Sequence, residues 1–156
     1  MRLFHASQNN YSPGQQIVAT SQSTFYPLAV PALDQAKPSG LPSRDICLCA
    51  TDDLAFAYLF AIKQKWPSDQ IRLYEVTMDK FHRAPMAVIH AVQRRLEASK
   101  DASALLSEYW SPKREWYYFE CIGPEMEIVG SVGTPDINEI VMTLNYQGDA
   151  SAAACL

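Results

Sequence analysis

The chain has 156 residues, 48% of them apolar and 19% charged, which is the composition of a single globular domain. A net charge of -4 argues against broad binding to nucleic-acid backbones, and no apolar run is long enough to cross a membrane. The N-terminal residues lack the apolar segment of a signal peptide, so we expect a cytoplasmic protein, or one exported without a cleavable signal.

The cysteines predict no disulfide framework and no metal centre. The chain contains Cys47, Cys49, Cys121 and Cys155. Cys47 and Cys49 are two residues apart in an apolar run, so they share one face if the run is a strand. Their spacing fits neither a redox CxxC motif nor a zinc knuckle, and we expect reduced thiols in the core.

The first third of the chain predicts short strands and a long loop. Residues 2–6 and 16–19 have strand composition, and Pro13-Gly14 marks a turn between them. Four prolines fall within residues 21–43, which indicates a loop with one helical turn near residues 32–37.

The middle of the chain predicts a strand, a helix and another strand. Residues 45–50 form a short apolar run, and Thr51 stands where a helix N-cap is expected. Apolar residues at helical spacing predict a helix over residues 52–65, which Pro67 ends. Residues 70–77 then alternate as in a strand.

The last part predicts two helices and two strands before a weakly patterned tail. Pro85 opens a helix over residues 86–98, and a shorter helix follows over residues 102–109. The aromatic run 115–122 and residues 126–132 have strand composition. We expect a domain over residues 1–133, an edge strand within 137–145, and a flexible tail to residue 156.

This order of elements favours an α+β domain with antiparallel pairing. No glycine-rich phosphate loop follows any of the expected strands, which argues against a Rossmann or P-loop fold.

Three dispersed motifs resemble the ADP-ribosyltransferase superfamily, in its poly(ADP-ribose) polymerase-like and diphtheria toxin-like branch. His5-Ala6-Ser7 is similar to the His-Gly-Thr/Ser motif of a first strand. Cys47 stands at the position of the first tyrosine, and Tyr58, eleven residues later, matches the second aromatic. Glu115 matches the catalytic glutamate that begins a late strand.

The small rifampin ADP-ribosyltransferases provide a second comparison. Residues 46–57 resemble their strand-to-helix segment, and residues 72–76 resemble their next strand. The resemblance implies a split pair of antiparallel sheets with flanking helices. It also implies NAD as a substrate, with a protein or small molecule as acceptor.

The resemblance implies a role for each matched residue. Glu115 would stabilise the oxocarbenium-like ribose, and His5 would hydrogen-bond the adenosine ribose. The backbone of Ala6, in the same motif as Ser7, would hydrogen-bond the amide group of nicotinamide. Tyr58 would stack on the nicotinamide ring.

Two departures from the motifs leave alternatives open. Ala6 replaces the usual glycine, and Cys47 replaces a stacking tyrosine, so a ring from Tyr11, Phe25 or Tyr26 would have to substitute. The alternatives are a non-catalytic binding module on the same fold and an NAD glycohydrolase. Glu75 and Glu120 compete for the acid role, but we expect both to be solvated or salt-bridged.

Overall fold

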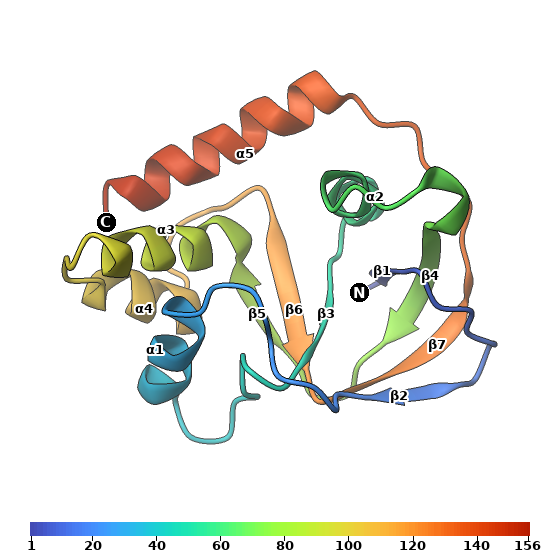
Figure 1. Ribbon diagram of the computed structural model, residues 1–156, viewed down its shortest axis with the longest axis horizontal. Coiled ribbons are helices and arrows are strands. Elements are labelled where there is room, and N and C mark those ends of the chain that lie inside the picture. Colours follow the sequence, from blue (N-terminus) through green and yellow to red (C-terminus); the bar gives the residue numbers. More distant parts are fainter.

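A computed structural model describes residues 1–156 and has a mixed α+β architecture, as expected (Figure 1). It contains two antiparallel sheets and five α-helices. The first sheet has the order β1 (Leu3–Ser7), β4 (Arg72–Thr77), β7 (Glu125–Ser131), β2 (Gln16–Val18). The second has the order β3 (Leu48–Ala50), β6 (Phe119–Gly123), β5 (His82–Pro85).

A backbone bridge joins the two sheets. The Phe4 amide donates to the Thr51 carbonyl at 2.7 Å, and the Thr51 amide donates back to Phe4 at 2.9 Å. Phe4 lies in β1 and Thr51 directly follows β3. The first strand of one sheet is therefore held beside the first strand of the other.

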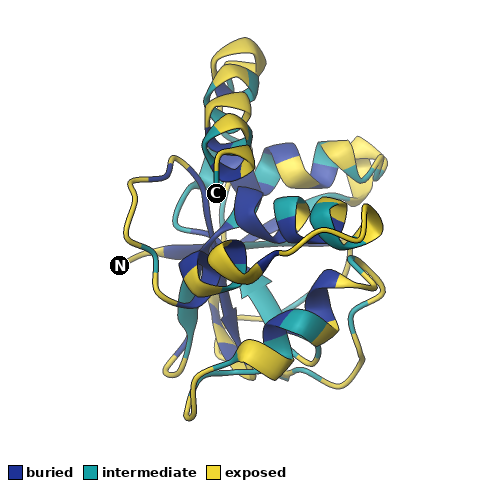
Figure 2. Ribbon diagram, turned by 90° about the vertical axis from the view of Figure 1, so that its left-hand side faces the viewer, coloured by how far each residue is buried: buried dark blue, intermediate teal, exposed yellow.

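The helices cover the two sheets unevenly. Three of them, α1 (Ala29–Ala36), α3 (Met86–Glu97) and α4 (Ser103–Trp110), pack together beside the second sheet (Figure 1). Helix α2 (Leu54–Lys63) packs on β1, and α5 (Glu139–Ala154) runs across to α3. Figure 2 shows buried residues gathered on the strands and on the inward faces of the helices. The largest apolar cluster joins the helices to β5 and β6.

Local sequence signals placed most elements correctly, with small differences at their ends. Asp53, and not Thr51, caps α2, because its side chain accepts the Phe56 amide at 2.9 Å. Helix α1 is longer than the expected turn, and Pro31 is tolerated because it stands in its first turn. The short strand β5, which pairs with β6 at one edge of the second sheet, was not expected.

The expected strand over residues 115–122 begins only at Phe119. The backbone amides of Tyr117 and Tyr118 are bound by the carboxylate of Asp149 in α5, and not by a neighbouring strand. Glu115 therefore lies in an irregular segment, four residues before the strand that it was expected to begin.

The expected edge strand and flexible tail are both wrong, because the segment forms the 16-residue helix α5. The Asn138 side chain caps this helix by accepting the Val141 amide at 3.1 Å. Asp149 and Ala153 are buried, and Ala153 belongs to the largest apolar cluster. Residues 134–156 are thus packed into the same domain as the rest.

Gly123 ends β6 at a place with no room for a side chain. A Cβ there would overlap the Lys80 carbonyl oxygen and the Met78 methyl group. We expect Gly123→Ala to lower the free energy of unfolding by about 1–3 kcal/mol, because the Lys80 backbone must move. Urea denaturation would measure this loss. Gly130→Ala is the control, since a Cβ at Gly130 meets nothing within 4 Å. Equal stability of the two variants would contradict this prediction.

Candidate functional site

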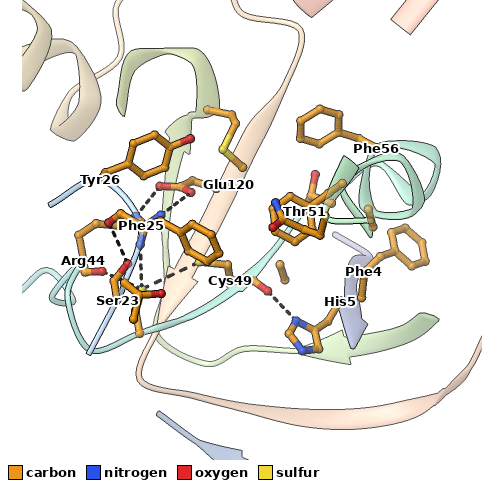
Figure 3. Close-up of a pocket in the computed structure, with 18 of the residues that line it drawn as sticks. Phe4, His5, Ser23, Phe25, Tyr26, Arg44, Cys49, Thr51, Phe56 and Glu120 are labelled. Carbon is orange, nitrogen blue, oxygen red and sulfur yellow. Dashed lines mark hydrogen bonds and ion pairs between the residues drawn. The ribbon is translucent and has the colours of Figure 1, made fainter. Parts of the chain in front are cut away.

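A cleft of about 460 Å³ opens where the two sheets meet (Figure 3). Residues from β1, β3 and β6 line it, together with α2 and the loop over residues 21–26. This volume falls within the range of small-molecule sites. His5, Ala6 and Cys47, which the sequence motifs single out, are among its lining residues.

His5 is held in place at the cleft by the neighbouring sheet. Its Nδ1 lies 2.7 Å from the Cys49 carbonyl oxygen. Because a carbonyl only accepts, Nδ1 carries the proton, and Nε2 makes no hydrogen bond within the protein. Burial lowers the pKa of His5, although the bond to the Cys49 carbonyl opposes this effect. A neutral imidazole with a free acceptor nitrogen is thus available to a ligand.

The lowered pKa of His5 predicts a loss of stability in acid. The unfolded imidazole titrates near pH ~6.5, and the folded one titrates lower. Below that pH the unfolded chain binds more protons than the folded one. The contribution of His5 is therefore present above pH ~6.5 and is lost as pH falls through the folded pKa.

We expect His5→Gln to remove this dependence, because glutamine can still donate to the Cys49 carbonyl but does not titrate. The measurement is the free energy of unfolding by urea for both proteins at about pH 7 and pH 5. The wild type should lose more than the variant over this interval. Equal losses would show that His5 titrates alike in both states.

Arg44 and Glu120 form an ion pair at another side of the cleft (Figure 3). Arg44 Nε lies 2.9 Å from one carboxylate oxygen, and Nη2 lies 3.2 Å from the other. The side chains are only 8% and 1% exposed. The Tyr109 hydroxyl donates a short hydrogen bond to the same carboxylate. Burial and the negative charge of Glu120 together raise the pKa of Tyr109 well above its usual range.

Aromatic side chains form much of the remaining cleft wall. Phe25 and Tyr26 come from the loop over residues 21–26, and Phe56 comes from α2. Tyr26 has a φ of 56°, a left-handed conformation that is uncommon for a tyrosine. It packs edge-on against His90, with ring centroids 6.1 Å apart. Phe25 is 56% exposed and is free to contact a ligand.

The structure brings some of the predicted site residues together and leaves others outside. His5, Ala6 and Cys47 line the cleft. Ser7 does not line it: the side chain is buried and accepts the Asn9 amide. Tyr58 lies outside the lining and packs against the small cluster around Phe4.

Glu115 is exposed and is not among the lining residues. The carboxylates that line the cleft are instead those of Asp45 and Glu120. Glu120, which was expected to be solvated or salt-bridged, is paired with Arg44, but it was not expected at the site. The feature that could have marked Glu120 is that it is an acidic residue inside a fully buried strand, Phe119–Gly123. Such a residue needs a partner of opposite charge.

Of the candidate stacking rings from the first loops, Phe25 and Tyr26 line the cleft, whereas Tyr11 packs against Tyr74.

No group of histidine, cysteine and acidic residues is arranged to hold a metal ion. None of the helices is both long and apolar enough to cross a membrane. The sequence matches no protein-family model, and no curated protein matches it.

Proposed function

We propose that the protein is a mono-ADP-ribosyltransferase of the ADP-ribosyltransferase fold, and that NAD binds in the cleft between the sheets. One observation carries this proposal. His5 on the first sheet and Glu120 on the second line the same cleft, with the Ala6 backbone and Cys47 beside them. In this proposal Glu120 takes the role that the sequence motifs assigned to Glu115.

Each lining group has a chemical task in such a reaction. The free Nε2 of His5 would accept a hydrogen bond from a ribose hydroxyl. The Ala6 backbone offers a donor and an acceptor to the nicotinamide amide. Phe25 would stack on a planar ring and supply the contact that Cys47 lacks. The Glu120 carboxylate would stabilise positive charge as the bond between nicotinamide and ribose breaks. The acceptor is a protein or a small molecule, and with water as acceptor the same site acts as an NAD glycohydrolase.

The Arg44–Glu120 pair favours a second candidate function, that of a non-catalytic binding module. Arg44 neutralises much of the charge on Glu120, and a neutralised carboxylate stabilises a cationic transition state less well. In this alternative the cleft would hold a nucleotide or a segment of a partner protein through its aromatic wall.

Thermal shift and nicotinamide release together separate the two candidates. With millimolar NAD, a ligand that binds only the folded state raises the melting temperature. A rise together with nicotinamide release supports the transferase, whereas a rise without release supports a module that binds the nucleotide and does not cleave it. No rise and no release would exclude NAD as the ligand of the cleft.

Two glutamate variants test the assignment of the carboxylate. Glu120→Gln should reduce nicotinamide release at least ~100-fold, since it removes the charge near the ribose. Glu115→Gln is the matched control and should leave release unchanged, because Glu115 is exposed and outside the cleft. Because loss of Glu120 also weakens the fold, each variant is assayed below its own melting temperature. His5→Gln, which leaves the ion pair intact, should weaken the thermal shift. The opposite pattern for the two glutamates would overturn the assignment to Glu120.

A further inference from the structure

Two thiols lie next to each other on the wall of the cleft. Cys47 Sγ and Cys49 Sγ are 4.0 Å apart, and both residues line the cavity. They point to the same side because alternate residues of an extended chain share a face. Both are partly exposed, so a small molecule in the cleft can reach them.

Cys49 and Arg44 together make Cys47 the more reactive of the two thiols. The Nη1 of Arg44 lies 3.8 Å from Cys47 Sγ, where its positive charge favours a thiolate. The hydrogen bond from Cys49, helped by Arg44, lowers the pKa of Cys47, while burial and Glu120 act in the other direction. The bond to Cys47 and burial raise the pKa of Cys49. The pKa of Cys47 is therefore the lower of the two, and its sulfur is the better nucleophile of the pair.

The other two cysteines have different surroundings. Cys121 is fully buried, and burial raises its pKa to about 12. Cys155 is exposed and directly follows α5. Only residues 47 and 49 combine an activating cation, a neighbouring thiol and a route from solvent.

We propose that Cys47 and Cys49 form a modification site for peroxide-class oxidants, which convert the pair into a disulfide within one chain. The Cys47 thiolate attacks a peroxide oxygen, so that an S–O bond forms, the O–O bond breaks, and hydroxide leaves as water after protonation. The Cys49 sulfur then attacks Cys47, so that the S–S bond forms and the S–O bond breaks. The released hydroxide takes the Cys49 proton as a second water. The two sulfurs lose two electrons in total, and the peroxide is reduced.

The geometry predicts that this disulfide is easily reduced. In an extended chain, residues two apart have Cα atoms about 6.6 Å apart, near the upper limit of about 6.8 Å for disulfides. The sulfurs must also move from 4.0 Å to bonding distance. A disulfide formed under this constraint has a higher reduction potential than a relaxed one. We therefore expect glutathione to reverse the modification.

Mass spectrometry tests the proposal without reference to NAD. The test protein is the full chain with Cys155→Ser, which prevents coupling between molecules through the exposed thiol. Trypsin releases Cys47 and Cys49 in one peptide, residues 45–63, and Cys121 in another, residues 115–156. After one equivalent of hydrogen peroxide, peptide 45–63 should lose the mass of two hydrogens, and peptide 115–156 should not change. Glutathione should restore the original mass.

Single variants identify the role of each sulfur. Cys47→Ser should slow oxidation of peptide 45–63 at least ~10-fold, because the activated sulfur is gone. Cys49→Ser should let peroxide add oxygen to Cys47 without forming a disulfide. Oxygen addition to Cys47 in the test protein, with Cys49 still reduced, would overturn the proposal. So would oxidation of Cys121 at the same rate as Cys47. Both results are independent of whether NAD binds in the cleft.

Discussion

Replacing Glu120 by alanine should lower the free energy of unfolding by about 3–5 kcal/mol. The substitution leaves the Arg44 guanidinium nearly buried without its counter-ion, and it leaves the Tyr109 hydroxyl without its acceptor. Burial alone would lower the pKa of Arg44, but attraction to Glu120 outweighs it and raises that pKa. Without Glu120 this attraction is lost, but a guanidinium is not deprotonated in proteins, so the variant bears the full free-energy cost of an isolated buried charge. Since domains of this size are stable by about 5–15 kcal/mol, the variant should lose a large part of its free energy of unfolding.

A double variant separates the cost of an isolated charge from the value of the pair. Arg44→Met with Glu120→Leu removes both charges and keeps comparable volume. We expect it to recover most of the lost stability, because a buried ion pair adds little net stability over an apolar pair. Urea denaturation at neutral pH measures all three proteins. If Glu120→Ala lost less than about 1 kcal/mol, water would be reaching the guanidinium and the pair would not be buried in solution.

Elements with local signals could be predicted from the sequence. Helix α2 follows from its apolar spacing, from acidic residues near its start and from Pro67 after it. Strand β4 follows from alternation, and α3 from the proline that precedes it. In each case the residues that define the element are near one another in the chain. The pairing of Phe4 with Thr51, which creates the cleft, has no local signal.

The candidate site could be predicted only in part, because some of its residues are positioned by contacts between segments that are distant in the chain. His5 and Ala6 lie within β1 and Cys47 directly precedes β3, and all three line the cleft. Glu115 was singled out because it resembles a catalytic glutamate at the start of a strand, and the run 115–122 has strand composition throughout. The strand begins later because a side chain distant in sequence takes the hydrogen bonds of its first residues. Glu115 precedes the strand and lies outside the cleft, whereas Glu120 lies within β6 and lines it.

Asp149 is the side chain that makes this contact, and its loss should be the second most costly change. It lies in α5 and is 2% exposed. One carboxylate oxygen accepts the Tyr117 amide at 3.0 Å, and the other accepts the Tyr118 amide at 3.0 Å. Hydrogen bonds to a charged acceptor are each worth about 1.5–3 kcal/mol. Asp149→Ala removes both and leaves a buried amide unsatisfied, so we expect a loss of about 3 kcal/mol.

Two further variants show whether the carboxylate acts through these bonds. Asp149→Asn keeps an acceptor oxygen and should lose less than Asp149→Ala. Asp136→Ala removes an exposed carboxylate in the segment before α5 and should change stability by less than about 0.5 kcal/mol. Hydrogen exchange provides a local reading, because the Tyr117 and Tyr118 amides should lose protection in Asp149→Ala before the rest of β6 does. Unchanged protection of these two amides would mean that α5 does not hold this segment. The tail would then be as independent of the domain as its small and polar composition suggested.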